Sequence, residues 1–281
     1  MEHASDSTIR TARHFSYNLP MDYFLILGCG DIGSAVAHQL KINECQVIIN
    51  DVRFPAHARC EMGFVSSFYD GASVLDGIKA TYVDVPQFQR NAAVLTCSID
   101  MIDIMSMAKP IAVIDARMSK RLIATPPAWW SFGAKPLLIG LGPGFTIAQN
   151  CDFAIETARG EFLGAEVLES TKVLDGDPLT VHGLSRERIV YSPSAGVWHT
   201  ALNVGDAVSK GDVIGYLDAE PLRAPATGTL RGISRDTAHV RMDQKIIEVD
   251  PSHQLKLTGI GERPLKVAQG VIHALKKRHF L

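Results

Sequence analysis

Three glycines with the spacing Gly-x-Gly-x-x-Gly follow an apolar run near the start of the chain. Gly28 allows a tight turn, Gly30 lets backbone amides approach a pyrophosphate, and Gly33 lets a helix lie close to the preceding strand. The first amides of that helix, at Asp31 and Ile32, add the positive end of the helix dipole. We therefore expect the loop to bind a phosphorylated, nucleotide-like ligand; a turn kept only for packing is the alternative.

The acidic residue Asp51 closes the next apolar run, about 20 positions beyond the loop. A carboxylate at this position accepts hydrogen bonds from a ribose, which favours NAD. Arg53, two residues later, is suited to a 2′-phosphate, so NADP stays open. The expected cofactor is thus NAD(P) or another phosphorylated nucleotide.

A second glycine-rich turn contains Gly140, Gly142 and Gly144 and directly follows another apolar run. Glycines lose more conformational entropy on folding than other residues, so three in one connection indicate a requirement beyond chain reversal. We expect backbone amides at Gly142 and Gly144 to face the same crevice as the first loop. The alternative is a tight turn into the next segment.

Charged residues follow the apolar run that ends at Ile114. Asp115 comes first, and Lys120 and Arg121 stand a few positions later. At the carboxyl end of a strand, such cations can clamp the phosphate or carboxylate groups of a ligand. A solvated helix start fits the pattern equally well, and the sequence leaves both open.

The sequence contains no motif that predicts a metal site or a catalytic group. The 10 histidines show no His-Glu-x-x-His spacing and the 5 cysteines no Cys-x-x-Cys pair, so no metal site is predicted. Cys29 lies inside the glycine loop. We favour the interpretation that it is a small residue tolerated there over the interpretation that it is an activated thiol. No catalytic acid or base can be singled out, so whether the protein is an enzyme stays open.

The overall charge and the cysteines bear on partners and compartment. A formal net charge of −2 argues against nucleic acid or an anionic membrane as partner. No stretch approaches a membrane span, and scattered free cysteines are typical of the cytoplasm, where we expect the protein. The oligomeric state, a homodimer included, stays open.

Strand and helix patterns alternate along the first half of the chain, and the predicted elements position the residues named above. A loose arm is expected at 1–20, followed by a Rossmann-type domain at 21–164, an α/β fold with a doubly wound parallel sheet. Its strands are predicted from five apolar runs and its first helix from apolar positions with helical spacing. The runs are Tyr23–Leu27, Gln46–Asn50, Val94–Leu95, Ile111–Ile114 and Leu137–Ile139.

The second half, at 165–254, contains a repeat with an offset of 32 positions, seen from Pro193 to Pro225 and from Val208 to Val240. Two similar β units should therefore pack face to face. The pattern resembles the barrel-sandwich hybrid fold of biotinyl and lipoyl domains. The segment joining the two copies has no lysine, so we expect no attached biotin or lipoate. The stretch 255–281 should form a helix that packs back on the first domain.

Several segments together resemble the accessory proteins of molybdenum hydroxylases, in the branch linked to selenium-dependent hydroxylase systems and related to xanthine dehydrogenase accessory factors. The resemblance covers nearly everything after about residue 22. It is carried by the stretches Leu27–Ala37, Val113–Arg121, Ile139–Thr146 and Ile155–Gly160 and by the repeat region.

This resemblance implies a role in the maturation of a xanthine dehydrogenase-like client enzyme, with molybdenum cofactor (molybdopterin) as the phosphorylated ligand. Two glycine turns with Lys120 and Arg121 suit such an anion. An NAD-dependent oxidoreductase acting on a small molecule is the alternative, although no positioned His-Asp pair for hydride transfer is apparent.

Overall fold

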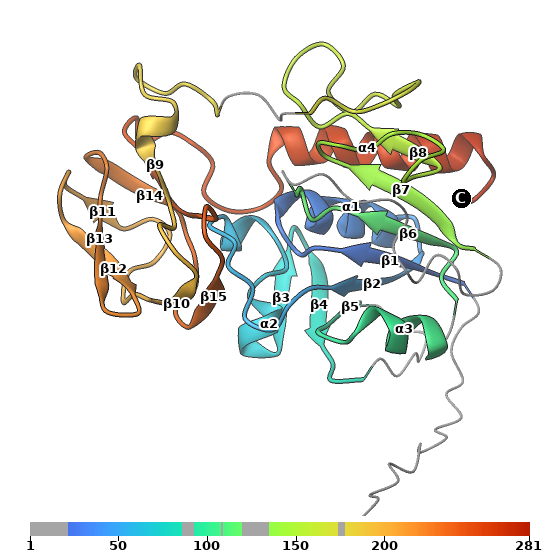
Figure 1. Cartoon of the computed structure of the whole chain (residues 1–281), viewed down its shortest axis with the longest axis horizontal. Helices are drawn as coiled ribbons and strands as arrows, with labels where there is room; N and C mark the ends of the chain where they lie inside the picture. The colour runs from blue at the N-terminus through green and yellow to red at the C-terminus, as the bar shows by residue number, and fades with distance from the viewer. Residues whose placement is uncertain (1–21, 86–92, 108, 120–134, 174–177) are drawn as a thin grey trace, which may run out of the picture.

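The computed structural model describes residues 22–85, 93–107, 109–119, 135–173 and 178–281. The arm expected at 1–20, together with Lys120 and Arg121, lies outside these ranges. The described chain forms an α/β unit, a β unit of two antiparallel sheets, and a long C-terminal helix (Figure 1). Among the described helices, none is long and apolar enough to cross a lipid bilayer.

An eight-stranded sheet with the order β3-β4-β5-β2-β1-β6-β7-β8 forms the α/β unit. Only β3 and β4 pair antiparallel. The strands are β1 (Tyr23–Leu27), β2 (Gln46–Asn50), β3 (Ala72–Leu75), β4 (Ile78–Tyr82), β5 (Val94–Cys97), β6 (Ala112–Asp115), β7 (Leu137–Leu141) and β8 (Phe153–Ile155). The sheet changes its direction of growth between β1 and β6, as dinucleotide-binding folds do. The five predicted runs all form strands, whereas β3, β4 and β8 were not predicted.

Helices cover both faces of this sheet. The described helices are α1 (Asp31–Ile42), α2 (Ser67–Asp70), α3 (Met101–Met107) and α4 (Glu262–Lys277), with the short 3-10 helices η1 (Cys60–Met62) and η3 (Arg186–Arg188). Phe24 and Ile26 of β1 point into the core under α1 and α4, and the alternate residues of β1 point into the core beside α3. Burial on both faces explains the continuous apolar run of a central parallel strand.

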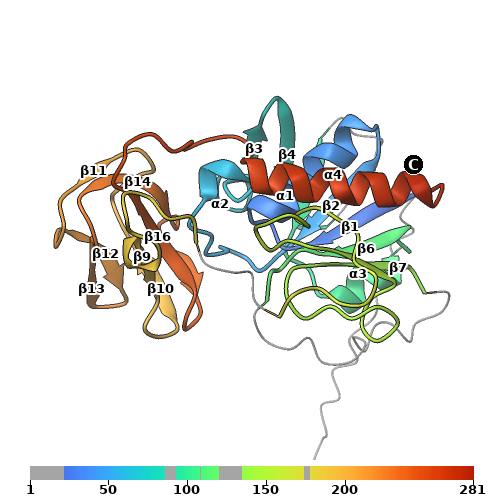
Figure 2. The same cartoon turned by 90° about the horizontal axis from the view of Figure 1, so that it is seen from above.

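The C-terminal helix α4 lies alongside α1 on the α/β unit (Figures 1 and 2). It begins at Glu262, within the stretch 255–281 expected to be helical, and Pro264 is tolerated because it lies in the first helical turn. A Cβ on Gly270 would lie 2.0 Å from the carbonyl oxygen of Gly164, so only glycine permits this close approach.

Two four-stranded antiparallel sheets, β13-β12-β10-β15 and β11-β14-β16-β9, form the β unit. The strands are β9 (Ile189–Tyr191), β10 (Gly196–His199), β11 (Ala207–Val208), β12 (Val213–Leu217), β13 (Glu220–Arg223), β14 (Gly228–Ile233), β15 (Ala238–Val240) and β16 (Lys245–Asp250). The offset of 32 positions carries Gly196, which begins β10, onto Gly228, which begins β14. Each sheet combines strands from both copies, so the two copies interlock around one core.

The boundary between the units falls later than position 165. Val167 donates a backbone hydrogen bond to Ala154 of β8, and Thr171 donates one to Phe145. Residues 165–171 therefore cover the exposed edge of β8, which would otherwise leave unpaired backbone groups. The boundary expected at 165 depends on local sequence patterns, which do not reveal that a segment pairs with a distant strand edge.

Candidate anion-binding site

The glycine loop has the backbone geometry that its spacing predicted. Gly28 follows β1 with a φ of 97°, and α1 begins directly after Gly30. A Cβ on Gly33 would lie 2.0 Å from the carbonyl oxygen of Gly28, so a side chain there would separate the helix from the loop. These glycines are required for the tight turn and for close packing of α1 on the sheet.

Side chains of the protein itself occupy much of the space in front of this loop. Asp51 Oδ2 accepts the amide of Cys29 at 2.8 Å and lies 3.1 Å from His57 Nε2. A Cβ built on Gly30 would lie 3.2 Å from the His57 ring, and the amide of Ile32 is bonded to the adjacent Asp31 carboxylate at 3.0 Å. A phosphate at this loop would have to displace these groups.

Asp51 is therefore engaged by the chain's own donors. Its Oδ1 also accepts the amide of Val52 at 2.7 Å. Burial raises the pKa of Asp51, but the hydrogen bonds from His57, Cys29 and Val52 outweigh burial and lower the pKa to about 2. The ribose contact expected of this carboxylate would require His57 to move.

Arg53, considered for a 2′-phosphate, is engaged as well. Its guanidinium donates to the carbonyl oxygen of Phe68 and lies 4.6 Å from the ring centroid of Phe54 and 4.1 Å from that of Tyr82. These cation–π contacts hold the side chain within the α/β unit. The geometry thus gives no support to a 2′-phosphate contact by Arg53.

The two glycine turns lie at the same edge of the sheet but do not touch. A Cβ on Gly28 would meet the carbonyl oxygen of Ala116 at 3.1 Å, and a Cβ on Gly142 would meet the sulfur of Met118 at 2.9 Å. The chain after β6 therefore lies between them, because β6 separates β1 from β7. Gly144 has a φ of 84°, and a Cβ built on it would meet no atom within 4 Å.

The charges expected after β6 largely pair with each other where they are described. Asp115 is buried and accepts hydrogen bonds from the backbone amide and the guanidinium of Arg117. Lys120 and Arg121 lie outside the described residues. The predicted phosphate clamp at this strand end thus stays a prediction.

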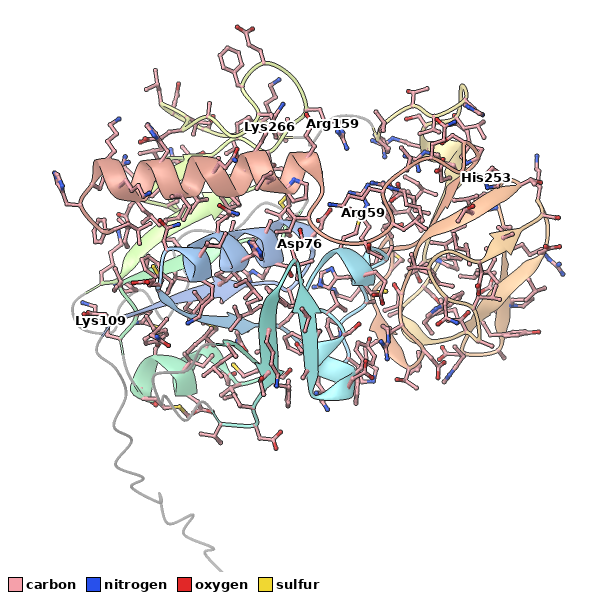
Figure 3. All side chains as sticks on the ribbon, turned by 180° about the vertical axis from the view of Figure 1, so that it is seen from behind. Arg59, Asp76, Lys109, Arg159, His253 and Lys266 are labelled. Carbon is pink, nitrogen blue, oxygen red and sulfur yellow. The ribbon has the colours of Figure 1, made fainter. Side chains whose placement is uncertain are left out.

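Basic side chains gather instead where the carboxyl edge of the sheet meets the β unit. We call this set the junction cluster. It comprises Asp31, Arg59, Arg159, Arg188, Arg231, Lys245, Glu248 and Arg263. Figure 3 shows Arg59 and Arg159 between the first turn of α4 and the β unit.

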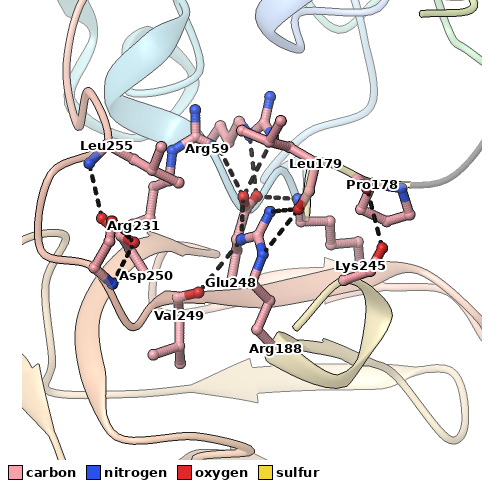
Figure 4. A network of polar contacts seen from close by, with 12 residues as sticks. Arg59, Pro178, Leu179, Arg188, Arg231, Lys245, Glu248, Val249, Asp250 and Leu255 are labelled. Carbon is pink, nitrogen blue, oxygen red and sulfur yellow. Dashed lines mark hydrogen bonds and ion pairs between the residues drawn. The ribbon is translucent and has the colours of Figure 1, made fainter. Parts of the chain in front are cut away.

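Glu248 of β16 is the centre of this cluster and is fully buried. Its carboxylate contacts Arg59 at 3.1 Å, Arg188 at 2.8 Å and Arg231 at 2.6 Å, and it also pairs with Lys245 (Figure 4). Burial raises the pKa of Glu248, but the attraction of Lys245, Arg59 and Arg231 outweighs burial and holds the pKa well below its usual value. One carboxylate therefore faces four cations.

Arg59 links this centre to the start of α1. Its Nη1 lies 2.9 Å from Asp31 Oδ2, while its Nε faces Glu248. Burial lowers the pKa of Arg59, but Asp31 and Glu248 outweigh burial and raise the pKa. Asp31, expected to contribute a backbone amide to a phosphate, thus contributes its side chain to an ion pair within the α/β unit, with the arginine that reaches Glu248 in the β unit.

Two further arginines add charge to the solvent-facing side of the cluster. Arg159 is exposed on the loop after β8, and Arg263 in the first turn of α4 donates from Nε to the carbonyl oxygen of Thr157 at 2.8 Å. Partial burial, followed by repulsion from Arg263, Arg59 and Arg231, lowers the pKa of Arg159. Arg159 therefore lies within electrostatic reach of three other arginines of the cluster.

Lys245 completes the basic set. Burial is the largest influence on it and outweighs the attraction of Glu248, so its pKa falls to about 8. Across the cluster, six basic side chains share the space with two carboxylates, Asp31 and Glu248. Arg263 in the first turn of α4 lies close enough to act on Asp31 in the first turn of α1, so the cluster also receives the positive ends of two helix dipoles. The arrangement is suited to a small polyanion.

Sequence reasoning did not identify this cluster. Its members extend from Asp31 to Arg263, and apart from Asp31, which lies in the glycine loop, they belong to no predicted site. Arg159 lies in the stretch Ile155–Gly160 and Lys245 in the repeat region, and neither segment predicted a binding site. Only the docking of the β unit against the carboxyl edge of the sheet brings them together.

Comparisons with known proteins give a curated relative and several solved structures that match in part, two of which are described below. The chain is 29% identical over 257 residues to "Uncharacterized protein YqeB" of Escherichia coli (strain K12), an alignment that covers 89% of this chain and 47% of that protein. The chain thus spans about half the length of the curated relative that it matches. No protein-family model matches the chain.

The structural matches are confined to small parts of the chain. A crystal structure of an aspartoacylase family protein from Mesorhizobium loti has a TM-score of 0.20 and 27% identity over 22% of each chain. The product-bound ectoine utilization protein EutE (DoeB) from Ruegeria pomeroyi has a TM-score of 0.21 and 17% identity over 32% of this chain and 27% of that chain.

Proposed function

We propose that this protein is an accessory protein of a molybdenum hydroxylase and binds a phosphorylated small molecule at the junction cluster. The ligand would be a nucleotide or a phosphorylated molybdopterin-type cofactor. The observation that carries the proposal is the excess of six basic side chains over two carboxylates at the carboxyl edge of the sheet. Open α/β sheets bind ligands at this edge, where strand order reverses.

The chemistry of the basic groups favours phosphate over a neutral ligand. Arginine guanidinium groups form paired hydrogen bonds to phosphate oxygens, and helix N-termini stabilise the same charge. Arg159 and Arg263 flank the start of α4, and Arg59 lies at the start of α1. A phosphorylated pterin or a nucleotide would present its phosphates to these groups. The resemblance to hydroxylase accessory proteins supplies the proposed client, a xanthine dehydrogenase-like enzyme.

The alternative, an NAD-dependent oxidoreductase with a Rossmann-type domain, receives support from the strand order and the glycine loop. The hydrogen bonds that Asp51 already accepts from Cys29, Val52 and His57 weigh against it. We therefore rank NAD(P) as ligand second.

The test is to identify what the protein holds. Full-length protein is purified, denatured, and its released small molecules are identified by mass. A phosphorylated pterin supports the proposal, whereas NAD alone with turnover of an alcohol or hydroxy acid supports the alternative.

If the purified protein releases no small molecule on denaturation, calorimetric titration with inorganic pyrophosphate tests the anion site directly. Binding that weakens as salt is raised is expected, since solvent-facing charges are screened at high ionic strength. Absence of pyrophosphate binding at low salt, with no pterin or nucleotide released, would refute the proposal.

A further inference from the structure

Three side chains with different metal-binding atoms meet beside the glycine loop. Cys29 belongs to that loop, Asp51 follows β2, and His57 lies in the segment before η1. One thiol, one carboxylate and one imidazole atom of these residues all lie within 4.8 Å of one another. They converge because β1 and β2 are paired neighbours, with Leu27 opposite Asn50, so both chains leave the sheet side by side.

The spacing of the three groups is close to that of a metal site. Bonds of about 2.0 to 2.3 Å in a tetrahedral zinc centre place the ligand atoms roughly 3.3 to 3.8 Å apart. His57 Nε2 and Asp51 Oδ2 are 3.1 Å apart, and the widest separation within the trio is at most 4.8 Å. Side-chain shifts of about 1 Å would therefore suffice to surround an ion.

Neighbouring groups hold two of these side chains in place. The amides of Cys29 and Val52 bind the Asp51 carboxylate and fix its orientation, as outer-sphere hydrogen bonds do at metal sites. Gly30 provides the space for the His57 ring, because a Cβ there would lie 3.2 Å from it.

The three side chains differ in their exposure to solvent. Cys29 is fully buried, whereas the side chains of Asp51 and His57 are 15% and 29% exposed. An ion held here would be reached from the His57 side, where solvent would supply a fourth ligand. Zinc sites with three protein ligands and one open position are typical of ions that bind or activate a further molecule.

We propose that Cys29, Asp51 and His57 form a zinc-binding site. A mixed sulfur, nitrogen and oxygen set fits Zn²⁺ better than Mg²⁺ or Ca²⁺, which require oxygen ligands. On binding, the zinc–sulfur bond forms as the S–H bond of Cys29 breaks, and the proton goes to solvent. His57 binds through Nε2 as neutral imidazole, with its proton on Nδ1. The thiolate and the Asp51 carboxylate then balance the two positive charges of the ion.

The experiment uses the full chain, freed of metal with a chelator and dialysed. Zinc is titrated in competition with a chromophoric chelator, and cobalt in place of zinc reports sulfur ligation by a charge-transfer absorption in the near ultraviolet. One equivalent of zinc and a cobalt–sulfur band are expected. Both readouts are independent of any anion, so they do not depend on the function proposed above.

Cys29→Ser and His57→Gln should each weaken zinc binding by more than about 100-fold, since even loss of an outer-sphere partner costs 10-fold to 100-fold. Cys60→Ser and His38→Gln, changes of a buried cysteine and a buried histidine outside the trio, should bind zinc like the unchanged protein.

Circular dichroism identifies any variant that fails to fold, and the cobalt band of the unchanged protein then decides alone. No zinc bound by the unchanged protein, a cobalt complex without the sulfur band, or equal affinity in folded Cys29→Ser would each overturn the assignment.

Discussion

The guanidinium of Arg59 lies 3.1 Å from the carboxylate of Glu248, and this contact joins the α/β unit to the β unit. Arg59 precedes η1, whereas Glu248 lies on β16, 189 positions later. The same arginine pairs with Asp31 at the start of α1. The contact that docks the two units therefore also fixes charged groups at the carboxyl edge of the sheet. Changes to these groups should alter both stability and anion binding.

Loss of the Glu248 charge should destabilise the fold. Glu248→Gln leaves Arg59, Arg188, Arg231 and Lys245 crowded around a neutral amide. Removing one partner of a buried ion pair lowers the free energy of unfolding by about 3 to 5 kcal/mol. Denaturant unfolding measures this change.

Pyrophosphate should stabilise Glu248→Gln more than the unchanged protein, because the anion supplies the missing negative charge. Asp236→Asn, which changes an exposed carboxylate of the same unit, should alter stability by less than about 1 kcal/mol. Equal stability of Glu248→Gln and Asp236→Asn would contradict the central role of Glu248.

Removal of Arg159 should weaken anion binding and leave stability nearly unchanged. Its side chain is exposed. Partial burial, followed by repulsion from Arg263, Arg59 and Arg231, lowers its pKa. The side chain therefore contributes little to the stability of the protein without a ligand. Calorimetric titration of Arg159→Ala with pyrophosphate should show affinity lowered about 10-fold, the loss of one charge-assisted hydrogen bond.

Lys109→Ala is the matched control for Arg159→Ala. Lys109 is also exposed, but it precedes β6 and lies at the opposite edge of the sheet (Figure 3). Its loss should leave pyrophosphate affinity unchanged. If both variants bind alike, the junction cluster is not the anion site.

Anion affinity should fall as pH rises through about 8. Lys245 has its pKa lowered to about 8, chiefly by burial, so it loses its charge while every arginine of the cluster keeps its own. Calorimetry in buffers of different ionisation enthalpy should also show proton uptake on pyrophosphate binding above this pH. Lys245→Gln should abolish both effects, and a pH dependence that persists in that variant would assign the titration to another group.

The effect of Lys245 on stability has the opposite sign. Between about pH 8 and pH 10.5 the unfolded chain keeps this proton and the folded protein has lost it. Because stability rises with pH wherever the unfolded state binds more protons, this lysine makes folding more favourable across that window. Urea unfolding at pH 7.5 and pH 9.5, compared between the unchanged protein and Lys245→Gln, measures the difference.

Replacement of Gly270 by alanine should destabilise the protein, although alanine has the higher helix propensity. Alanine stabilises a helix by about 1 kcal/mol relative to glycine. A Cβ at Gly270, however, would lie 2.0 Å from the carbonyl oxygen of Gly164. We expect Gly270→Ala to lower the free energy of unfolding by about 1 to 3 kcal/mol, as overpacking does. His273→Ala, on the exposed face of the same helix, should not lower it, and a Gly270→Ala protein as stable as His273→Ala would show that the backbones can separate freely.

The sequence by itself determined the features that depend on local pattern. The apolar run Tyr23–Leu27 predicted β1, the glycine spacing predicted the turn into α1, and the offset of 32 positions predicted two similar copies in the β unit, although not that their strands interlock. These features follow from the periodicity of burial and from the backbone freedom of glycine, both of which act over a few residues.

Only the tertiary structure decided which charged groups meet. Arg59 and Glu248 carry no local signal of their contact, and neither Asp51 nor His57 shows in the sequence that it occupies the space before Gly30. An ion pair across 189 positions exists because the α/β unit and the β unit dock on each other. Docking depends on the shapes of whole surfaces, which no short window of sequence contains.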